Sequence, residues 1–175
     1  MPELPEVQTI VDGLNGAGVP GRVVVRVETD WPRMIEGCSQ SDFYRRMEGA
    51  RIETIGRRGK FIVCGLSCGS LLLHLRMSGR VNLVRAGTEH AKHEHLVLVL
   101  NDGRELRLHD TRKFGRVYLV DDENEILGAL GMEPLSPQFR SERFARAIAS
   151  RKRMIKPLDR KSTRLNSSHR YVARM

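Results

Sequence analysis

The first residues of the chain, Met-Pro-Glu-Leu-Pro-Glu, place a proline and two carboxylates beside the N-terminus. If Met1 is removed, Pro2 carries a free secondary amine, and an α-amino group with a pKa near ~8 is partly unprotonated at neutral pH. Such an amine can attack an aldehyde-level carbon to form an iminium, with Glu3 and Glu6 as acid and base. Acidic residues in a first helical turn also complement the helix dipole, so the pattern has a purely structural interpretation too.

Four further segments combine cations, histidines and an aromatic ring in short stretches. Each also has a structural interpretation, as a solvated turn, a packed methionine or a polar strand edge. The two histidines of the segment 92–95 could bind a metal ion only with a third ligand, and the sequence offers none nearby. In the fourth, Arg112 and Phe114 could enter a duplex together, because a ring can wedge between bases while a guanidinium hydrogen-bonds a base. The segments are Gly-Arg-Arg-Gly-Lys-Phe at 56–61, His-Leu-Arg-Met-Ser-Gly at 74–79, Lys-His-Glu-His at 92–95 and His-Asp-Thr-Arg-Lys-Phe-Gly at 109–115.

The elements that would position these residues are mostly strands. Pro5 suits the first turn of a helix, and Val7, Ile10, Val11 and Leu14 then repeat on one face. Short apolar or alternating runs follow, many separated by Gly, Asn and Asp, which is typical of a β-sandwich or barrel with flanking helices. We therefore expect an α+β fold with a β-sandwich catalytic domain. The expected strands are 22–27, 60–64, 70–75, 79–84, 95–100, 105–109 and 115–120.

Local signals predict the connections and a second module. Asn101-Asp102-Gly103 predicts a hairpin turn, and residues 41–47 predict a short helix capped by Ser41. The pattern changes near residue 131, and residues 141–150 predict a basic helix that begins a helical module. We expect domains at 1–130 and 131–158.

The last residues have a different character. Residues 159–169, Asp-Arg-Lys-Ser-Thr-Arg-Leu-Asn-Ser-Ser-His, show no apolar periodicity and match the in-frame translation of a widely used sequencing adapter. We therefore expect the protein's own sequence to stop at about Leu158. Residues 159–175 are then expected to be disordered read-through that takes no part in the fold. The alternative is a polar disordered tail.

Charge and cysteine content narrow the class of protein. The 175 residues carry a net charge of +9. Residues 1–139 hold 18 Lys and Arg against 19 Asp and Glu, whereas residues 140–175 hold 12 against 2. A basic segment suits a polyanion such as nucleic acid, although it can also be a solvated helix face. The 3 cysteines include no C-x-x-C pair, which argues against a disulfide framework or a four-cysteine zinc site.

Membrane and secretion signals are absent from the pattern. No apolar run approaches the ~20 residues of a membrane span, and no basic segment leads into an apolar one at the start. We expect a cytoplasmic protein without a membrane partner.

Taken together and in order, the motifs resemble those of bacterial formamidopyrimidine-DNA glycosylase. The resemblance includes Met-Pro-Glu-Leu-Pro-Glu-Val at the start, the four segments above, and Leu-Gly-Met-Glu-Pro-Leu-Ser at 130–136, and it runs to about residue 158. Leu4 favours this branch over its sister, endonuclease VIII, which typically has glycine there. The resemblance implies a glycosylase and abasic-site lyase acting on oxidised purines, such as 8-oxoguanine and formamidopyrimidines, in duplex DNA. We expect a monomer.

The resemblance also implies roles for individual residues. Pro2 would attack C1′ of the damaged nucleotide, Glu3 would donate a proton in base removal and ring opening, and Glu6 would support it. Lys60 would serve β-elimination and grip phosphate. A base must leave the stack before an enzyme can reach C1′. The side chains that would fill the resulting void are Met77, Arg112 and Phe114, with Arg112 facing the orphaned cytosine, and further DNA contacts would come from His93, Arg151 and Lys156.

The sequence departs from the family by omission. The helix-two-turn-helix module with its Gly-Asn turn, the loop over the flipped base and the four-cysteine zinc finger have no counterpart after Leu158. The full-length family implies one zinc ion, but its ligands are missing here, so we expect no metal in this chain. Because each lost phosphate contact weakens DNA binding, we expect weak or absent glycosylase activity. The alternative is a DNA-binding fragment without catalysis; an RNA-binding domain ranks lower, because only 5% of residues are aromatic.

Overall fold

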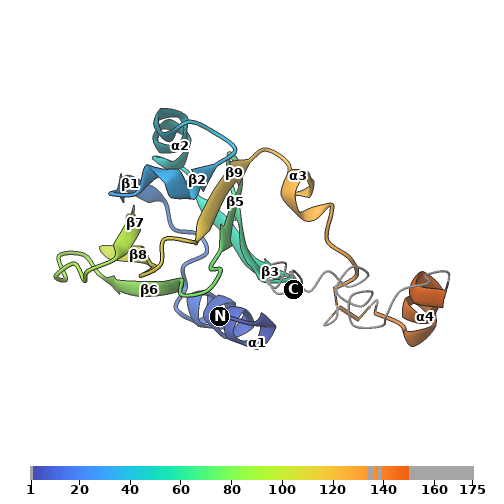
Figure 1. Ribbon diagram of the computed structural model, residues 1–175. Helices are drawn as coiled ribbons and strands as arrows, with labels where there is room; N and C mark the ends of the chain where they lie inside the picture. Colours follow the sequence, from blue (N-terminus) through green and yellow to red (C-terminus); the bar gives the residue numbers. More distant parts are fainter. Residues whose placement is uncertain (1, 134–135, 138, 150–175) are drawn as a thin grey trace, which may run out of the picture.

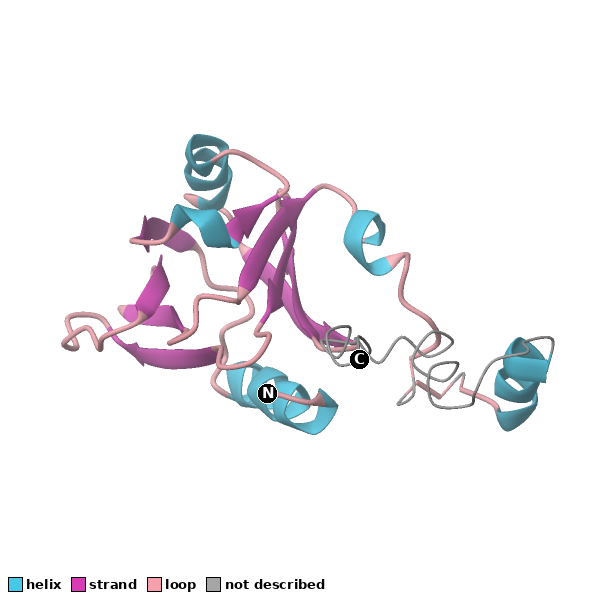
Figure 2. Ribbon diagram, in the orientation of Figure 1, coloured by secondary structure: helices cyan, strands magenta, loops and turns pink. Residues whose placement is uncertain are grey.

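Two β-sheets form the body of the protein in the computed structural model, which describes residues 2–133, 136–137 and 139–149 (Figures 1 and 2). One sheet has the strand order β1-β7-β8-β6, and the other has the order β2-β9-β5-β4-β3. Only the β2–β9 pair is parallel among the named strands. The strands are β1 (Val24–Thr29), β2 (Ile35–Glu36), β3 (Ile52–Arg58), β4 (Phe61–Leu66), β5 (Gly69–His74), β6 (Arg80–Arg85), β7 (Glu94–Leu100), β8 (Arg104–His109) and β9 (Arg116–Val120).

The helices lie outside the sheets. In Figure 1, α1 and α2 lie at opposite ends of the two sheets, α3 follows β9, and α4 lies apart from the sheets. They are α1 (Leu4–Gly16), the 3-10 helix η1 (Pro32–Met34), α2 (Gln40–Met47), α3 (Asn124–Leu127) and α4 (Ser141–Ala149).

The N-terminal helix α1 forms for the reasons the sequence predicts. Pro5 lies in its first turn, where a missing N–H needs no partner. Val7, Val11 and Leu14 are buried on one face, which packs against β3 and β4. The hydrophobic face of α1 therefore fixes the start of the chain against the five-stranded sheet.

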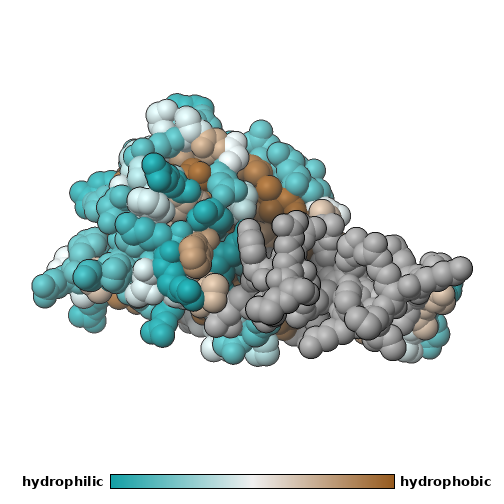
Figure 3. All heavy atoms as spheres, in the orientation of Figure 1, coloured by the Kyte–Doolittle hydropathy of each residue, from teal (hydrophilic) through white to brown (hydrophobic). Residues whose placement is uncertain are grey.

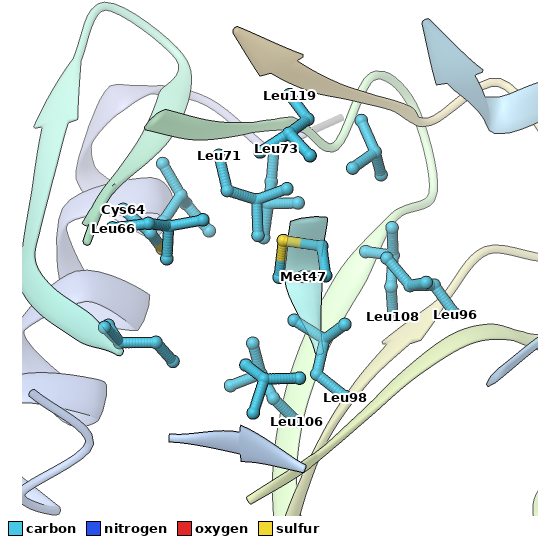
Figure 4. Close-up of a cluster of buried hydrophobic side chains, with 14 of the residues drawn as sticks. Met47, Cys64, Leu66, Leu71, Leu73, Leu96, Leu98, Leu106, Leu108 and Leu119 are labelled. Atoms are coloured by element: carbon cyan, nitrogen blue, oxygen red, sulfur yellow. The ribbon is translucent and has the colours of Figure 1, made fainter. Parts of the chain in front are cut away.

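The main core lies between the two sheets and confirms the expected sandwich. Alternate residues of β4, β5 and β9 meet those of β7 and β8, because side chains of a strand point to opposite faces in turn. Met47 of α2 lies among leucines of both sheets in Figure 4. The labelled residues around it are Cys64, Leu66, Leu71, Leu73, Leu96, Leu98, Leu106, Leu108 and Leu119.

The other face of the five-stranded sheet carries a smaller cluster. Phe61, Leu72 and Val120 point away from the main core and pack with Leu127 of α3. The short helix α3 thus covers this face. The surface visible in Figure 3 is mostly hydrophilic, with a few apolar side chains between polar ones.

Several predicted elements differ from the structure in detail. Ser39, not Ser41, caps α2, because its hydroxyl accepts the Asp42 N–H at 3.1 Å, three residues along. The segment 56–61, expected as a turn, is largely the end of β3, and only Gly59 and Lys60 make the turn. Strands β2 and β3 were not predicted, since β2 has two residues and a register shift between Ile52 and Thr54 breaks the alternation of β3.

The outer face of the four-stranded sheet buries a complete charge network. Arg107 is 1% exposed and donates to Glu105 and to Glu94, each at 2.8 Å. The same guanidinium donates to the carbonyl oxygens of Thr88 and Glu89 at 2.6 and 3.1 Å. Arg107 therefore fixes the β6–β7 loop onto the sheet.

No helix among the described residues is long and apolar enough to cross a membrane.

Arg107→Met is expected to lower the free energy of unfolding by about 3–5 kcal/mol, because it leaves two buried carboxylates without their cation. Urea denaturation measures the change. Arg85→Met, at an exposed strand end, is the matched control and should change stability by less than about 0.5 kcal/mol. Equal effects of the two substitutions would contradict the role given to the network.

Candidate active site at the N-terminus

The N-terminus lies beside a buried lysine. Lys60 is 5% exposed, and its ammonium nitrogen lies 2.5 Å from a carboxylate oxygen of Glu3. Glu6 accepts a hydrogen bond from the Glu3 backbone N–H at 3.0 Å, as in one half of a capping box. Pro2 is half-buried and directly precedes Glu3 in the chain. The structure thus brings together all four residues for which catalysis is predicted.

The turn that carries Lys60 is held by a second carboxylate. Glu133 accepts hydrogen bonds from Arg57 at 2.6 Å, Arg58 at 3.2 Å and the Gly59 N–H at 2.9 Å. Burial acts to raise the pKa of Glu133, but the hydrogen bond from Arg57 and the other donors outweigh it and hold the pKa below its usual range. Glu133 therefore stays ionised and ties the segment after α3 to the Lys60 turn.

Arg57 extends this network to α1. Its Nε donates to Gln8 at 2.8 Å, while one of its terminal nitrogens donates to the Gly59 carbonyl oxygen at 2.8 Å. One guanidinium thus connects the first helix, the lysine turn and Glu133. The relative position of the N-terminus and Lys60 is fixed by these contacts as well as by the Glu3–Lys60 ion pair.

A neutral histidine lies behind the lysine. Burial and the positive charges of Arg76 and Lys60 lower the pKa of His74 to about 3. Its Nδ1 accepts the Arg76 N–H at 3.0 Å, and its ring contacts Phe61 edge-on, with 4.7 Å between ring centroids. An uncharged imidazole can lie next to Lys60 without repelling its ammonium group.

A cleft of about 520 Å³ connects the N-terminus with the start of β6. Pro2 and Glu6 line it from the start of α1, and Gly79 and Arg80 line it from the other side. Gly79 follows Met77 and Ser78, so the cleft leads from the amine-bearing residue toward the second group of predicted site residues.

Met77, Arg112 and Phe114, which the family resemblance groups together, lie together on the surface. Met77 and Phe114 are 43% and 45% exposed, an unusual state for large apolar side chains. The Arg112 guanidinium lies 5.3 Å from the centroid of the Phe114 ring, and one of its nitrogens lies 3.6 Å from the Met77 sulfur. We call these three residues the wedge cluster.

Asp110 holds the two segments that carry the wedge cluster. It is 1% exposed and accepts hydrogen bonds from the Ser78 hydroxyl, from the Gly115 N–H at 2.6 Å and from the Arg112 N–H at 3.2 Å. Burial acts to raise the pKa of Asp110, but these donors outweigh it and leave the pKa below its usual range. A Cβ at Gly115 would lie 3.1 Å from this carboxylate, so glycine permits the close approach.

His93 lies near the wedge cluster in a histidine group. Its backbone φ is +75°, and its ring centroid lies 6.0 Å from those of both His95 and His109. Partial burial lowers the pKa of His93, and the neighbouring charges of Lys92 and Lys113 lower it further. His93 is thus held neutral within positively charged surroundings.

The residues that the structure describes do not form the zinc site that the family implies. Among the described residues, no group of three or more His, Cys, Asp or Glu could hold a metal ion. Burial raises the pKa of the Cys64 thiol to about 12, which disfavours the thiolate that zinc needs. Cys68 instead donates a hydrogen bond to the Arg46 carbonyl oxygen. Arg151, Lys156 and the expected read-through at 159–175 lie outside the described residues.

Three site residues were not found from the sequence alone. Asp110 and Glu133 appear only as members of longer motifs, although an acid beside a cluster of cations was the available signal. Trp31 carries no motif, and only the fold brings it near Lys113, whose ammonium lies 4.1 Å from the ring centroid.

Comparison with known proteins adds independent findings. Residues 1–117 match the model of the formamidopyrimidine-DNA glycosylase N-terminal domain. A Roseiflexus sp. protein named formamidopyrimidine-DNA glycosylase is 46% identical over 162 residues, covering 90% of this chain and 59% of its own length. The Bacillus subtilis protein of the same name is 37% identical over 169 residues, covering 93% of this chain and 61% of its own length.

Solved structures with this architecture contain DNA. Lactococcus lactis Fpg, in complex with DNA containing an abasic site, has a TM-score of 0.81 at 28% identity and covers 93% of this chain and 61% of that chain. A structure of MutM with DNA containing carbocyclic 8-oxo-G has the same score and identity, covering 93% and 62%. These matches define the class as a DNA glycosylase N-terminal domain.

The chain belongs to the formamidopyrimidine-DNA glycosylase family. It spans about 60% of the length of the curated relatives it matches.

Asp110→Asn is expected to lower the free energy of unfolding by about 1–3 kcal/mol at pH 7. The amide has one oxygen where the carboxylate has two, so one of the buried N–H donors loses its acceptor. The pKa of Asp110 is lower in the folded protein than in the unfolded chain, where it is near ~3.9. Ionised Asp110 therefore stabilises the folded state above the unfolded pKa, and this stabilisation is lost as pH falls through the folded pKa. The difference between wild type and variant should therefore shrink below about pH 4. Urea denaturation at several pH values measures it, with exposed Glu53→Gln as control; a constant difference would contradict the account.

Proposed function

We propose that the protein acts in base-excision repair as a glycosylase and abasic-site lyase on oxidised purines in duplex DNA. The observation that carries the proposal is the Glu3–Lys60 ion pair of 2.5 Å immediately beside Pro2. It groups a carboxylate, an ammonium group and the position of a secondary amine at one place. Nucleophilic catalysis needs such a combination of an amine and proton-transferring groups.

The proposed first step is displacement of the damaged base. With Met1 removed, the Pro2 nitrogen attacks C1′ and the bond from C1′ to the base nitrogen breaks. The base leaves with the electron pair of that bond and takes the proton that the Pro2 nitrogen gives up. Glu3 takes up a proton from water and donates it to the ring oxygen, which leaves C1′ with the electron pair of its C–O bond as the iminium forms. Glu6 holds the Glu3 backbone in place through the 3.0 Å hydrogen bond.

The proposed second step is β-elimination. The iminium acidifies the C2′ proton, which passes to the Glu3 carboxylate left by the first step. The 3′ phosphate then leaves with the electron pair of its C–O bond. Water then releases Pro2 from the unsaturated sugar. Lys60 is suited to this step, because its ammonium group can neutralise the leaving phosphate while Glu3 keeps it oriented.

The chemistry requires an extruded nucleotide, and the wedge cluster is suited to replace it. An exposed methionine and an exposed phenylalanine can occupy the space between base steps, while Arg112 hydrogen-bonds the unpaired base. We propose that His93 and Arg151 contact the DNA and that Lys156 contacts a phosphate. The damaged DNA in the related solved structures supports DNA as the ligand.

The 175-residue chain spans about 60% of its relatives, so the whole activity is proposed with one restriction. We propose that this chain alone releases 8-oxoguanine weakly or not at all, because fewer phosphate contacts hold the duplex. The bacterial relatives suggest that the protein works in the bacterial cytoplasm, on the nucleoid.

Borohydride reduction in the presence of duplex DNA with one abasic site should trap a covalent protein–DNA complex, because reduction converts the Pro2 iminium to a stable amine. Denaturing electrophoresis detects the complex, and mass spectrometry of the digested adduct should assign it to Pro2. A chain with one extra residue ahead of Pro2 is the matched control and should give no adduct. Absence of any adduct from wild type whose Met1 is removed would favour the rival reading, a DNA-binding fragment without catalysis.

Lys60→Ala is expected to slow strand cleavage at an abasic site by about 10²-fold, the lower end of the contribution of a positioned acid–base group. Borohydride trapping should fall much less, since Pro2 still forms the iminium. Cleavage and trapping are followed on the same labelled duplex. Arg85→Ala serves as the control, and a parallel loss of cleavage and trapping in Lys60→Ala would contradict a role of Lys60 in elimination.

A further inference from the structure

A tryptophan holds two cations next to the wedge cluster. Lys113 lies between Arg112 and Phe114 in the sequence, with a backbone φ of +58°. Its ammonium nitrogen lies 4.1 Å from the centroid of the Trp31 ring, and the Arg33 guanidinium carbon lies 5.5 Å from the same centroid. We call Trp31, Arg33 and Lys113 the cation shelf.

The shelf is built on a rigid base. The Trp31 ring packs against the main core, and its backbone N–H donates to the Thr29 hydroxyl at 3.1 Å. Its carbonyl oxygen accepts the Met34 N–H at 3.1 Å, which closes the turn of η1 that carries Arg33. The positions of both cations are therefore set by the fold and by contact with the same aromatic ring.

The two cations keep their charge available. The acids nearest in sequence have other partners: Asp30 bonds the His95 ring at 2.7 Å, and Glu36 pairs with Arg116 at 2.6 Å. Within the described part of the chain, no ion pair joins Arg33 or Lys113 to a carboxylate. Unpaired cations held in fixed positions suit an anion from outside the molecule.

The shelf also continues the positive surface around the wedge cluster. His93 lies at the start of the same turn, because its carbonyl oxygen accepts the Asp110 N–H at 2.9 Å, three residues before Lys113. Arg112 and Phe114 flank Lys113 directly in the chain. A duplex that receives the wedge cluster must therefore bring its backbone to the residues beside it.

We propose that the cation shelf is a further phosphate-binding surface, which holds a phosphodiester of the duplex next to the wedge cluster. The proposal rests on the proposed function in requiring DNA at the wedge cluster, but it does not require chemistry at Pro2. Trp31 positions both cations, and Arg33 and Lys113 contact the phosphodiester. Contacts of this kind add affinity without reading sequence.

Trp31 is the 1 tryptophan of the chain, so its fluorescence reports on the shelf. Titration with a short duplex carrying one abasic site should change the Trp31 emission and give a dissociation constant at each salt concentration. Lys113→Gln and Arg33→Gln should each bind several-fold more weakly and lower the slope of log K against log salt by about one. An undamaged duplex should show the same loss of slope in both variants, since the contact is to phosphate.

Arg85→Gln is the matched control. Arg85 ends β6, whose first residue pairs with His109, so it lies ~17 Å further along the strand at ~3.4 Å per residue. It should bind like wild type. Unchanged slopes in both shelf variants, or wild-type binding without any change in Trp31 emission, would overturn the proposal. Loss of the borohydride adduct with intact salt slopes would instead count against the proposed function and leave the shelf standing.

Discussion

A reactive group at the start of a chain is held by peptide bonds from one side only, so all other restraints must come from how the first helix packs. Here Val7, Val11 and Leu14 bury one face of α1 against the five-stranded sheet. The Glu3–Lys60 ion pair then fixes the residue next to Pro2. The distance from Pro2 to Lys60 and the width of the cleft toward β6 both depend on this docking, because Lys60 and the β6 side of the cleft belong to other elements than α1.

Buried carboxylates provide the second layer of order. Glu133 gathers donors around the Lys60 turn, and Asp110 gathers donors from the two segments that carry the wedge cluster. Each stays ionised because hydrogen bonds to the charged form outweigh the cost of burial. As a result, the exposed side chains of the wedge cluster stand on a fixed backbone, and the buried Lys60 is held in a fixed turn.

Most of the architecture was predictable from the sequence, because alternation and turn residues report on local structure. The apolar face of α1 and seven of the strands follow from such patterns. Strand β2 was not predictable, since two residues carry no period and their pairing with β9 is set by tertiary contacts. Asp110, Glu133 and Trp31 were missed for the same reason. Their partners lie 2 to 82 residues away in sequence, and only the fold brings them together.

The central claim is that one surface places the Pro2 amine and the wedge cluster on the same duplex. The crystal structure of the borohydride-reduced adduct with abasic duplex DNA tests it most directly. The account predicts a single bond from the Pro2 nitrogen to C1′, with the Glu3–Lys60 pair beside it and the three wedge side chains in the gap left by the extruded nucleotide. A bond from C1′ to another amine, or a duplex bound on a face that leaves Met77, Arg112 and Phe114 in solvent, would contradict it.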